Sequence, residues 1–265
     1  MRILFIGDVV GKPGRRIVSG LLSNIRNAYK VDFVIANAEN ASGGFGVTPK
    51  VVTELLDYGI EVLTSGNHVW DKKEIIAWFD KDKKSLLRPA NYPAGNPGTG
   101  SVVVSTASGE KIGILNIIGR VFMASVDCPF RTAIKEVDKL RQETNTILVD
   151  IHAEATSEKV AMGWFLDGKV SAVVGTHTHI PTADETILPE GTAYITDVGM
   201  TGAMDSVIGM KKEIIIERFL TQRPQRSKVA KGNVELNAVI IDVDPQTGRS
   251  TSIKRLRMDI TSVHP

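Results

Sequence analysis

The sequence has a single cysteine, no long apolar run and almost no excess of charge, and each of these absences excludes a class of protein. Cys128 has no partner within the chain, so an intrachain disulfide is excluded and a reducing compartment is expected. The apolar run at the N-terminus stops at Gly7 and Asp8, far short of a signal peptide or a membrane span. We therefore expect a soluble cytoplasmic protein.

The charged residues are nearly balanced, with 32 Lys and Arg against 30 Asp and Glu and a formal net charge of +2. Bulk charge of this size does not attract nucleic acid or a membrane surface. The basic, polar stretch 220–233 lacks interleaved aromatic residues, so it is interpreted as a mobile solvated loop rather than a nucleic-acid contact. Any anionic ligand is therefore expected to bind at a local site.

Short β-branched runs alternate with segments of helical period, which is typical of an α/β fold. With 265 residues and 42% apolar residues, the chain is expected to form a single domain over 1–265. Helices are predicted from Pro13, from Pro49 to Gly59, from Pro129, and around Trp164; residues 86–100 are predicted to be an irregular loop. Strands are predicted at 2–7, 32–37, 60–65, 146–152 and 170–176, and hairpins at 101–118 and 233–258.

Polar side chains capable of binding a metal follow nearly every predicted parallel strand. Four of the five histidines of the chain, His68, His152, His177 and His179, follow the predicted strands in this way. Ligands bind at the carboxyl edge of a parallel sheet because the strand-to-helix loops converge there. The candidate metal ligands are Asp8, Glu39, Asn40, Asn67, His152, His177 and His179.

The chemistry of this set is oxygen and imidazole without thiolate, which suits Mn²⁺, Fe²⁺ and Zn²⁺. Seven ligands are more than one ion takes while keeping a position open for substrate, whereas two ions with a bridging carboxylate would use them all. His177 and His179 are two residues apart, so only a turn would let both reach one site, each addressing a different ion. The sequence therefore predicts a two-metal centre.

The order of these motifs resembles that of the calcineurin-like metallophosphoesterases. In that family an Asp follows the first strand, a carboxylate the second and Gly-Asn-His the third, before a lone His and Gly-x-His-x-His. The first motif departs from the family's Asp-x-His, and the second from its Gly-Asp. These departures, with "GRVFM" at 119–123 and "TDVGMTG" at 196–202, resemble the YmdB-like branch. The matching segments are "GD" at 7–8, "AEN" at 38–40, "GNH" at 66–68, His152, and "GTHTH" at 175–179.

The resemblance implies a four-layer α/β/β/α sandwich and a phosphodiesterase with two divalent ions per chain. The mixed oxygen and nitrogen ligands admit iron and manganese equally, with zinc behind them. The resemblance also implies cyclic nucleotide substrates, 2′,3′-cyclic ones first and 3′,5′-cyclic AMP second, and a homo-oligomer. Glu39 would bridge the ions, and the resemblance assigns Asp8, Asn40 and His179 to one ion. It assigns Asn67, His152 and His177 to the other.

His68 is the candidate catalytic residue, because it adjoins Asn67 but cannot easily reach the same ion. A hydroxide held between the metals would attack phosphorus, and His68 would stabilise the phosphate or protonate the departing oxygen. Asp71 would set the tautomer of His68, and Asp197 is a candidate to support a ligand. Arg120, Gly43 and Gly44 are candidates for binding the substrate phosphate.

Two other functions remain open from the residues alone. A nucleotide phosphomonoesterase would use the same metals with a pocket of different shape. A non-catalytic regulator that binds a nucleotide or RNA would keep the metals for structure. His68 discriminates between an enzyme and a binding protein, since only an enzyme needs it for turnover.

Overall fold

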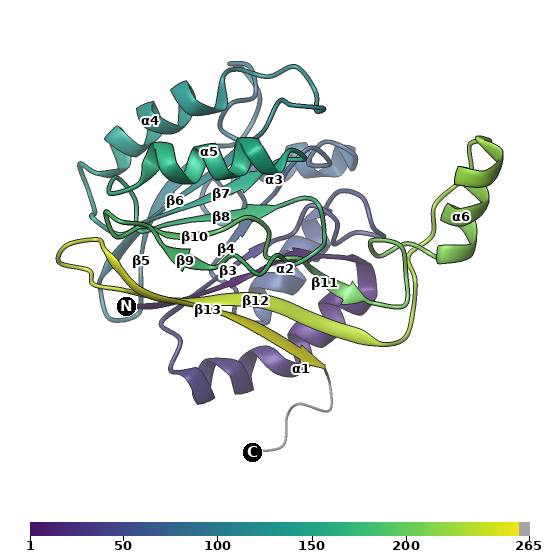
Figure 1. Ribbon diagram of the computed structural model, residues 1–265, viewed down its shortest axis with the longest axis horizontal. Coiled ribbons are helices and arrows are strands. Elements are labelled where there is room, and N and C mark those ends of the chain that lie inside the picture. The colour runs from purple at the N-terminus through teal and green to yellow at the C-terminus, as the bar shows by residue number, and fades with distance from the viewer. Residues whose placement is uncertain (260–265) are drawn as a thin grey trace.

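The computed structural model describes residues 1–259 as two β-sheets packed face to face, with helices outside them (Figure 1). The first sheet has the order β2 (Asp8–Val9), β11 (Met200–Ala203), β12 (Val234–Val243), β1 (Arg2–Ile6), β3 (Phe33–Asn37) and β4 (Val62–Thr64), and β13 (Ser250–Asp259) also pairs with β12. The second has the order β5 (Ser101–Ser105), β6 (Lys111–Ile118), β7 (Ile147–His152), β8 (Ala172–Thr176), β10 (Ala193–Ile195) and β9 (Thr186–Ile187).

Six α-helices are described. Helices α1 (Gly11–Tyr29), α2 (Pro49–Asp57) and α3 (Ile76–Lys81) contribute to the core on the outer face of the first sheet. Helices α4 (Pro129–Leu140) and α5 (Thr156–Leu166) contribute to the core on the outer face of the second. A short 3₁₀ helix, η1 (Lys73–Ile75), precedes α3, and α6 (Lys212–Thr221) projects from the body of the molecule (Figure 1).

The alternation of side chains along β1 explains the layers. Ile3 and Phe5 belong to the core between the sheets, whereas Leu4 and Ile6 belong to the core beneath the helices of the first sheet. Successive side chains of a strand point to opposite faces, so a strand buried on both sides reads as a continuous apolar run. The predicted α/β/β/α sandwich is confirmed.

The strands that carry the candidate ligands run parallel within each sheet. β1, β3 and β4 are parallel neighbours, as are β6, β7 and β8. The predicted hairpins are β5–β6 and β12–β13, and both are antiparallel. Residues 86–100 lack a helix or a strand, as predicted.

Three details differ from the sequence predictions. Helix α1 begins at Gly11, so Pro13 lies inside its first turn rather than at its start. The 220–233 segment begins in helix α6, which was not predicted because only Ile215 of that helix is buried, leaving no clear apolar stripe. The helices η1 and α3 were also missed, since they are only three and six residues long.

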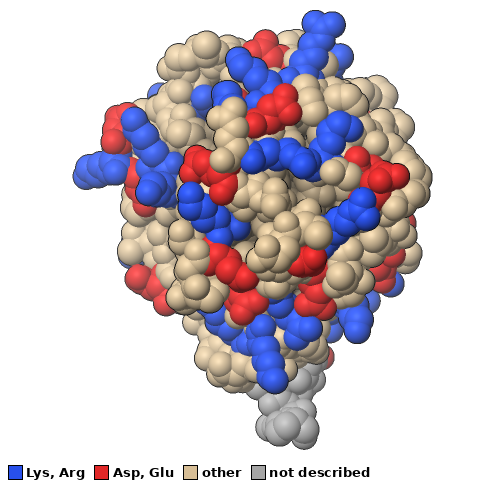
Figure 2. Space-filling model, turned by 90° about the vertical axis from the view of Figure 1, so that its left-hand side faces the viewer, with Lys and Arg blue, Asp and Glu red and all other residues tan. Residues whose placement is uncertain are grey.

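Two observations concern the helices and one face of the surface. Within residues 1–259, no helix combines the length and the apolar character needed to cross a bilayer. On the face shown in Figure 2, Lys and Arg side chains lie among Asp and Glu side chains rather than in one basic patch.

Candidate metal centre and active site

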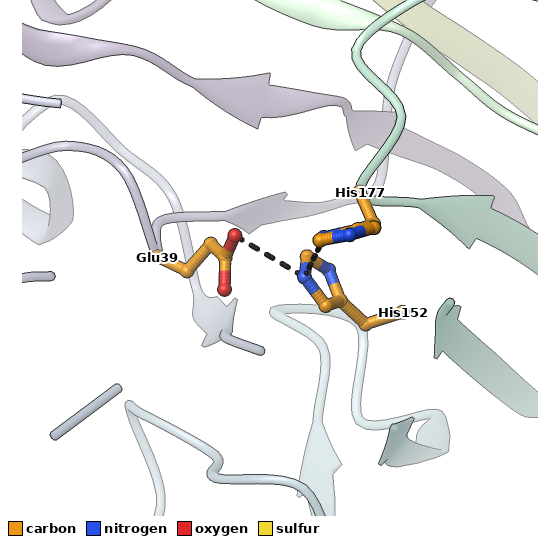
Figure 3. A group of neighbouring side chains, drawn as sticks. All are labelled: Glu39, His152 and His177. Atoms are coloured by element: carbon orange, nitrogen blue, oxygen red, sulfur yellow. Dashed lines mark hydrogen bonds and ion pairs between the residues drawn. The ribbon is translucent and has the colours of Figure 1, made fainter. Parts of the chain in front are cut away.

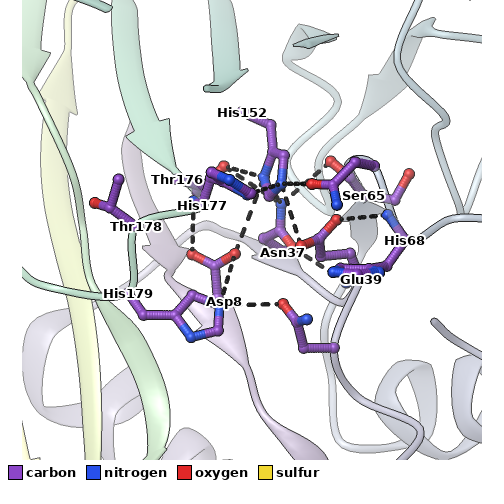
Figure 4. Close-up of polar contacts among 12 residues, drawn as sticks. Asp8, Asn37, Glu39, Ser65, His68, His152, Thr176, His177, Thr178 and His179 are labelled. Atoms are coloured by element: carbon purple, nitrogen blue, oxygen red, sulfur yellow. Dashed lines mark hydrogen bonds and ion pairs between the residues drawn. The ribbon is translucent and has the colours of Figure 1, made fainter. Parts of the chain in front are cut away.

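The loops at the carboxyl ends of five strands bring all seven candidate metal ligands together (Figure 4 labels five of them). His152, at the end of β7, is the hub of this cluster. Its Nε2 lies 3.1 Å from Glu39 Oε1, 3.1 Å from Asn67 Oδ1 and 3.0 Å from His177 Nδ1. Glu39, His152 and His177 form a group whose ligand atoms all lie within 4.8 Å of one another (Figure 3).

Asp8, Asn40 and His179 form the other side of the cluster. His179 Nε2 lies 3.3 Å from Asn40 Oδ1 and 3.9 Å from Asp8 Oδ1. Asp8 Oδ1 is buried and has no hydrogen-bond partner within the described residues. Because an unpaired buried carboxylate oxygen is costly, a cation at this position would relieve it.

His179 and Asn40 each donate a hydrogen bond to a backbone carbonyl outside the cluster, so the atoms that they present to the cluster are acceptors. His179 Nδ1 donates to the Ile208 carbonyl at 3.0 Å, which leaves the Nε2 lone pair facing Asp8. Asn40 Nδ2 donates to the Gly44 carbonyl at 3.0 Å, which leaves Oδ1 free to bind a metal. The donor set therefore fits divalent ions.

His152 is oriented by a buried chain of hydroxyl and carboxylate groups. The Thr176 hydroxyl donates to Asp150 Oδ1 at 2.7 Å and so accepts from His152 Nδ1 at 2.9 Å. Asp150 also accepts from Thr64 and Asn37, and burial raises its pKa. Nε2 is therefore the atom of His152 that remains available to a metal. Sequence reasoning did not identify this buried support.

The turn that carries His177 and His179 is held by Asp197. Both histidines have positive φ, 98° and 67°, a region that non-glycine residues rarely occupy. Between them, Thr178 donates its backbone N–H at 3.1 Å and its hydroxyl at 2.6 Å to Asp197 Oδ2. The same oxygen accepts from Lys159 Nζ at 2.6 Å, and both partners of this ion pair are fully buried. The predicted turn is confirmed, whereas Lys159 gave no signal in the sequence.

The cluster shifts the pKa values of its members. Burial raises the pKa of Asp8 to about 6, against the opposing charges of His179 and His152. Burial would also raise the pKa of Glu39, but contact with His152 lowers it to about 2. Burial would lower the pKa of His152, yet Glu39 raises it to about 9. Burial and the neighbouring His152 lower the pKa of His177 to about 3. Without metal, Glu39 therefore faces a protonated His152, and a bound cation would displace that proton.

His68 lies at the edge of a cavity of about 320 Å³, which Glu39, Asn40, His177 and His179 also line. Its Nδ1 lies 2.8 Å from Asp71 Oδ2, and its backbone N–H donates to Glu39 Oε2 at 3.1 Å. Asp71 thus accepts a hydrogen bond from Nδ1, which sets the tautomer as predicted, and Nε2 takes no part in this contact.

The three residues predicted to bind phosphate lie in different places. Gly44 lines the cavity and orients Asn40 through its carbonyl. Gly43 lines a different cavity of about 830 Å³ beside α1, which contains none of the candidate ligands. Arg120 is exposed and does not line the cavity at His68. A role of Gly43 or Arg120 in binding substrate therefore stays a prediction without support from this geometry.

Comparisons with known proteins agree with this architecture. Residues 4–256 match the family model described as YmdB-like protein. The chain is 50% identical to a 2′,3′-cyclic-nucleotide 2′-phosphodiesterase of Bacillus subtilis (strain 168), an alignment that covers 97% of this chain and 96% of that protein.

Two solved structures are also similar over nearly the whole chain. One is a hypothetical protein of Thermus thermophilus, with a TM-score of 0.91, 42% identity, and coverage of 97% of this chain and 99% of that one. The other is a phosphatase of Mycoplasma pneumoniae, with a TM-score of 0.90, 37% identity, and coverage of 97% and 93%. The chain therefore belongs to the YmdB-like family, within the metallophosphoesterases.

Proposed function

We propose that the protein is a metal-dependent phosphodiesterase that hydrolyses 2′,3′-cyclic nucleotides. The observation that carries this proposal is the convergence of buried metal-ligand atoms on a cavity that His68 also lines. The Bacillus subtilis relative, whose name specifies this activity, supports the choice of substrate. 3′,5′-Cyclic AMP is the second candidate substrate.

Two divalent ions per chain are proposed, iron or manganese before zinc. Asp8, Asn40 and His179 would hold one ion, Asn67, His152 and His177 the other, and Glu39 would bridge them. When bound, such ions polarise the phosphate and lower the pKa of a coordinated water toward ~7. Asn40 and Asn67 are neutral ligands, so they add no negative charge to a site that must accept an anion.

His68 is proposed to move the proton of the reaction. Asp71 accepts a hydrogen bond from Nδ1, because its Oδ2 lies 2.8 Å from that nitrogen, and so fixes the orientation of the ring with Nε2 on the opposite side. A protonated Nε2 would then donate to the ribose oxygen that leaves phosphorus as the cyclic phosphate opens. The His68 side chain is 27% exposed, so the ring retains contact with solvent.

The test combines elemental analysis with hydrolysis of bis(p-nitrophenyl) phosphate and of 2′,3′-cyclic AMP. We expect about two ions per chain in the wild type, and loss of both metal and activity in Glu39→Gln. The control is Glu190→Gln, since Glu190 is 67% exposed and pairs only with Arg249 among the ion pairs of residues 1–259. Metal-loaded protein without hydrolysis of either diester would contradict the proposal and favour a binding protein.

A second variant tests the catalytic residue. His68→Ala should keep its metal content and lose roughly 100- to 10,000-fold in kcat, the usual contribution of a general acid. Normal turnover by this variant would contradict the role given to His68. A preference of the wild type for phosphomonoesters over both diesters would instead indicate a nucleotide phosphomonoesterase.

A further inference from the structure

The cavity at His68 has an aromatic side that the proposed chemistry leaves unused. Phe45 and Phe219 line it together with the candidate metal ligands. Neither ring belongs to a hydrophobic core cluster of the described residues. Phe219 is exposed and Phe45 is partly buried, and aromatic rings at the edge of a binding site are candidates for contacts with a ligand.

Phe45 is placed at the cavity by a glycine-rich turn. Its ring packs against the His68 imidazole edge to face, with centroids 5.1 Å apart and an angle of 66° between the planes. Gly44, the preceding residue, has φ of 96°, and a Cβ there would lie 2.6 Å from Met210. Glycine at this position therefore allows the loop to present the Phe45 ring beside the metal centre.

Phe219 belongs to α6, the helix that projects from the body (Figure 1). Ile215, Arg218 and Phe219 line the cavity, and their spacing of three and four residues places them on one face of the helix. Phe219 is 65% exposed, so its ring is available to a ligand. Leu220, the next residue along, is 80% exposed but does not line the cavity.

Arg218 adds a positive charge beside this ring. Its guanidinium carbon lies 6.0 Å from the centroid of Phe219, and it forms no ion pair with any residue in 1–259. The other charged lining residues are Glu39 and Glu154, besides the histidines. A cation and two aromatic rings next to a metal centre match the parts of a nucleotide, which are an anionic phosphate and a flat base.

We propose that Phe219 and Phe45 form a nucleobase subsite, in which the base of the substrate stacks while its cyclic phosphate lies at the metal centre. This inference rests on the proposed function and specifies how that site recognises a nucleoside. Stacking on an aromatic ring accepts every base, so the subsite selects nucleotides over simple phosphodiesters without selecting one base strongly.

The experiment compares two substrates that differ only in the base: 2′,3′-cyclic AMP and the base-free methyl β-D-ribofuranoside 2′,3′-cyclic phosphate. Phe219→Ala should raise KM for 2′,3′-cyclic AMP by roughly 5- to 100-fold, the range expected for one lost stacking contact. KM for the base-free substrate and kcat for both should stay within about twofold of wild type. Phe219→Trp, which keeps an aromatic face, should retain the wild-type KM for 2′,3′-cyclic AMP.

Leu220→Ala is the matched control, because it removes a neighbouring apolar side chain of α6 outside the cavity. An equal rise in KM for this control would mean that the position of α6, rather than the Phe219 ring, determines KM, and it would overturn the proposal. Equal losses by Phe219→Ala on both substrates, or no change on either, would also overturn it. If the wild type hydrolysed neither substrate, the proposed function itself would be contradicted. Failure of the subsite proposal and failure of the proposed function are therefore distinguishable.

Discussion

The buried ion pair between Lys159 and Asp197 gives the sharpest test of how the metal-binding turn is held. Both side chains are fully buried, and their charged atoms lie 2.6 Å apart. Asp197 Oδ2 also accepts both hydrogen bonds of Thr178. Lys159→Met keeps most of the aliphatic side chain but leaves the Asp197 carboxylate buried without its cation.

The structure sets the size of the expected effect. Removing one partner of a buried pair costs about 3–5 kcal/mol, because the remaining charge loses compensation in a medium that solvates it poorly. An exposed pair contributes about 0–1 kcal/mol. The control is Arg223→Met, since Arg223 and its partner Glu217 are 71% and 51% exposed. Lys159→Met should therefore destabilise the protein several times more than the control.

The assay measures the free energy of unfolding in urea, on metal-free protein in the presence of a chelator. Without metal, the contribution of the ion pair is measured apart from any stabilisation by a bound ion. A loss of less than about 1 kcal/mol for Lys159→Met, comparable with the control, would refute the reasoning. Metal titration of the folded variant is the second readout. Its affinity should fall on the order of tenfold or more, because His177 and His179 flank the residue that Asp197 holds.

Two further predictions concern the centre itself. In Gly66→Ala the new Cβ would lie 2.3 Å from His152 Nε2 and 2.4 Å from Glu39 Oε2. Metal affinity, measured by titration, should therefore fall roughly 10- to 100-fold. Unchanged affinity would contradict this prediction. Metal-free protein should lose stability between about pH 6.5 and 9, because the raised pKa of His152 stabilises the fold only while the ring is protonated. Urea unfolding across this window checks it; His152→Gln should flatten the slope, and a wild-type stability that rises with pH would contradict it.

The ligand set could be predicted because its members follow strand ends, where parallel topology gathers the loops whatever the details of packing. The position of the C-terminal hairpin could not. Its two strands are evident in the sequence, but nothing local shows that β12 pairs antiparallel with β1 and so enters the first sheet. Helix α6 was missed for a related reason. Its side chains project from the body, so burial imposes little pattern on them.

The buried hydroxyl and carboxylate groups that orient His152 could have been recognised from the sequence, because they follow the two-residue alternation of the strands. Alternate residues of each strand face the core between the sheets, and these rows are apolar until they reach the carboxyl end. In four strands, two in each sheet, the row becomes polar there. The rows are Phe33, Ile35 and Asn37 in β3; Val62 and Thr64 in β4; Leu148, Asp150 and His152 in β7; and Ala172, Val174 and Thr176 in β8.

Hydrogen bonds join the polar ends of these rows across the two sheets. Asp150 accepts from Asn37, Thr64 and Thr176, so one buried carboxylate connects three strands to the hub of the metal cluster. A buried network in which every polar group is paired fixes its members in place. The sandwich therefore does more than gather the loops: its inner core ends in a polar layer that sets the orientation of His152 before any metal binds.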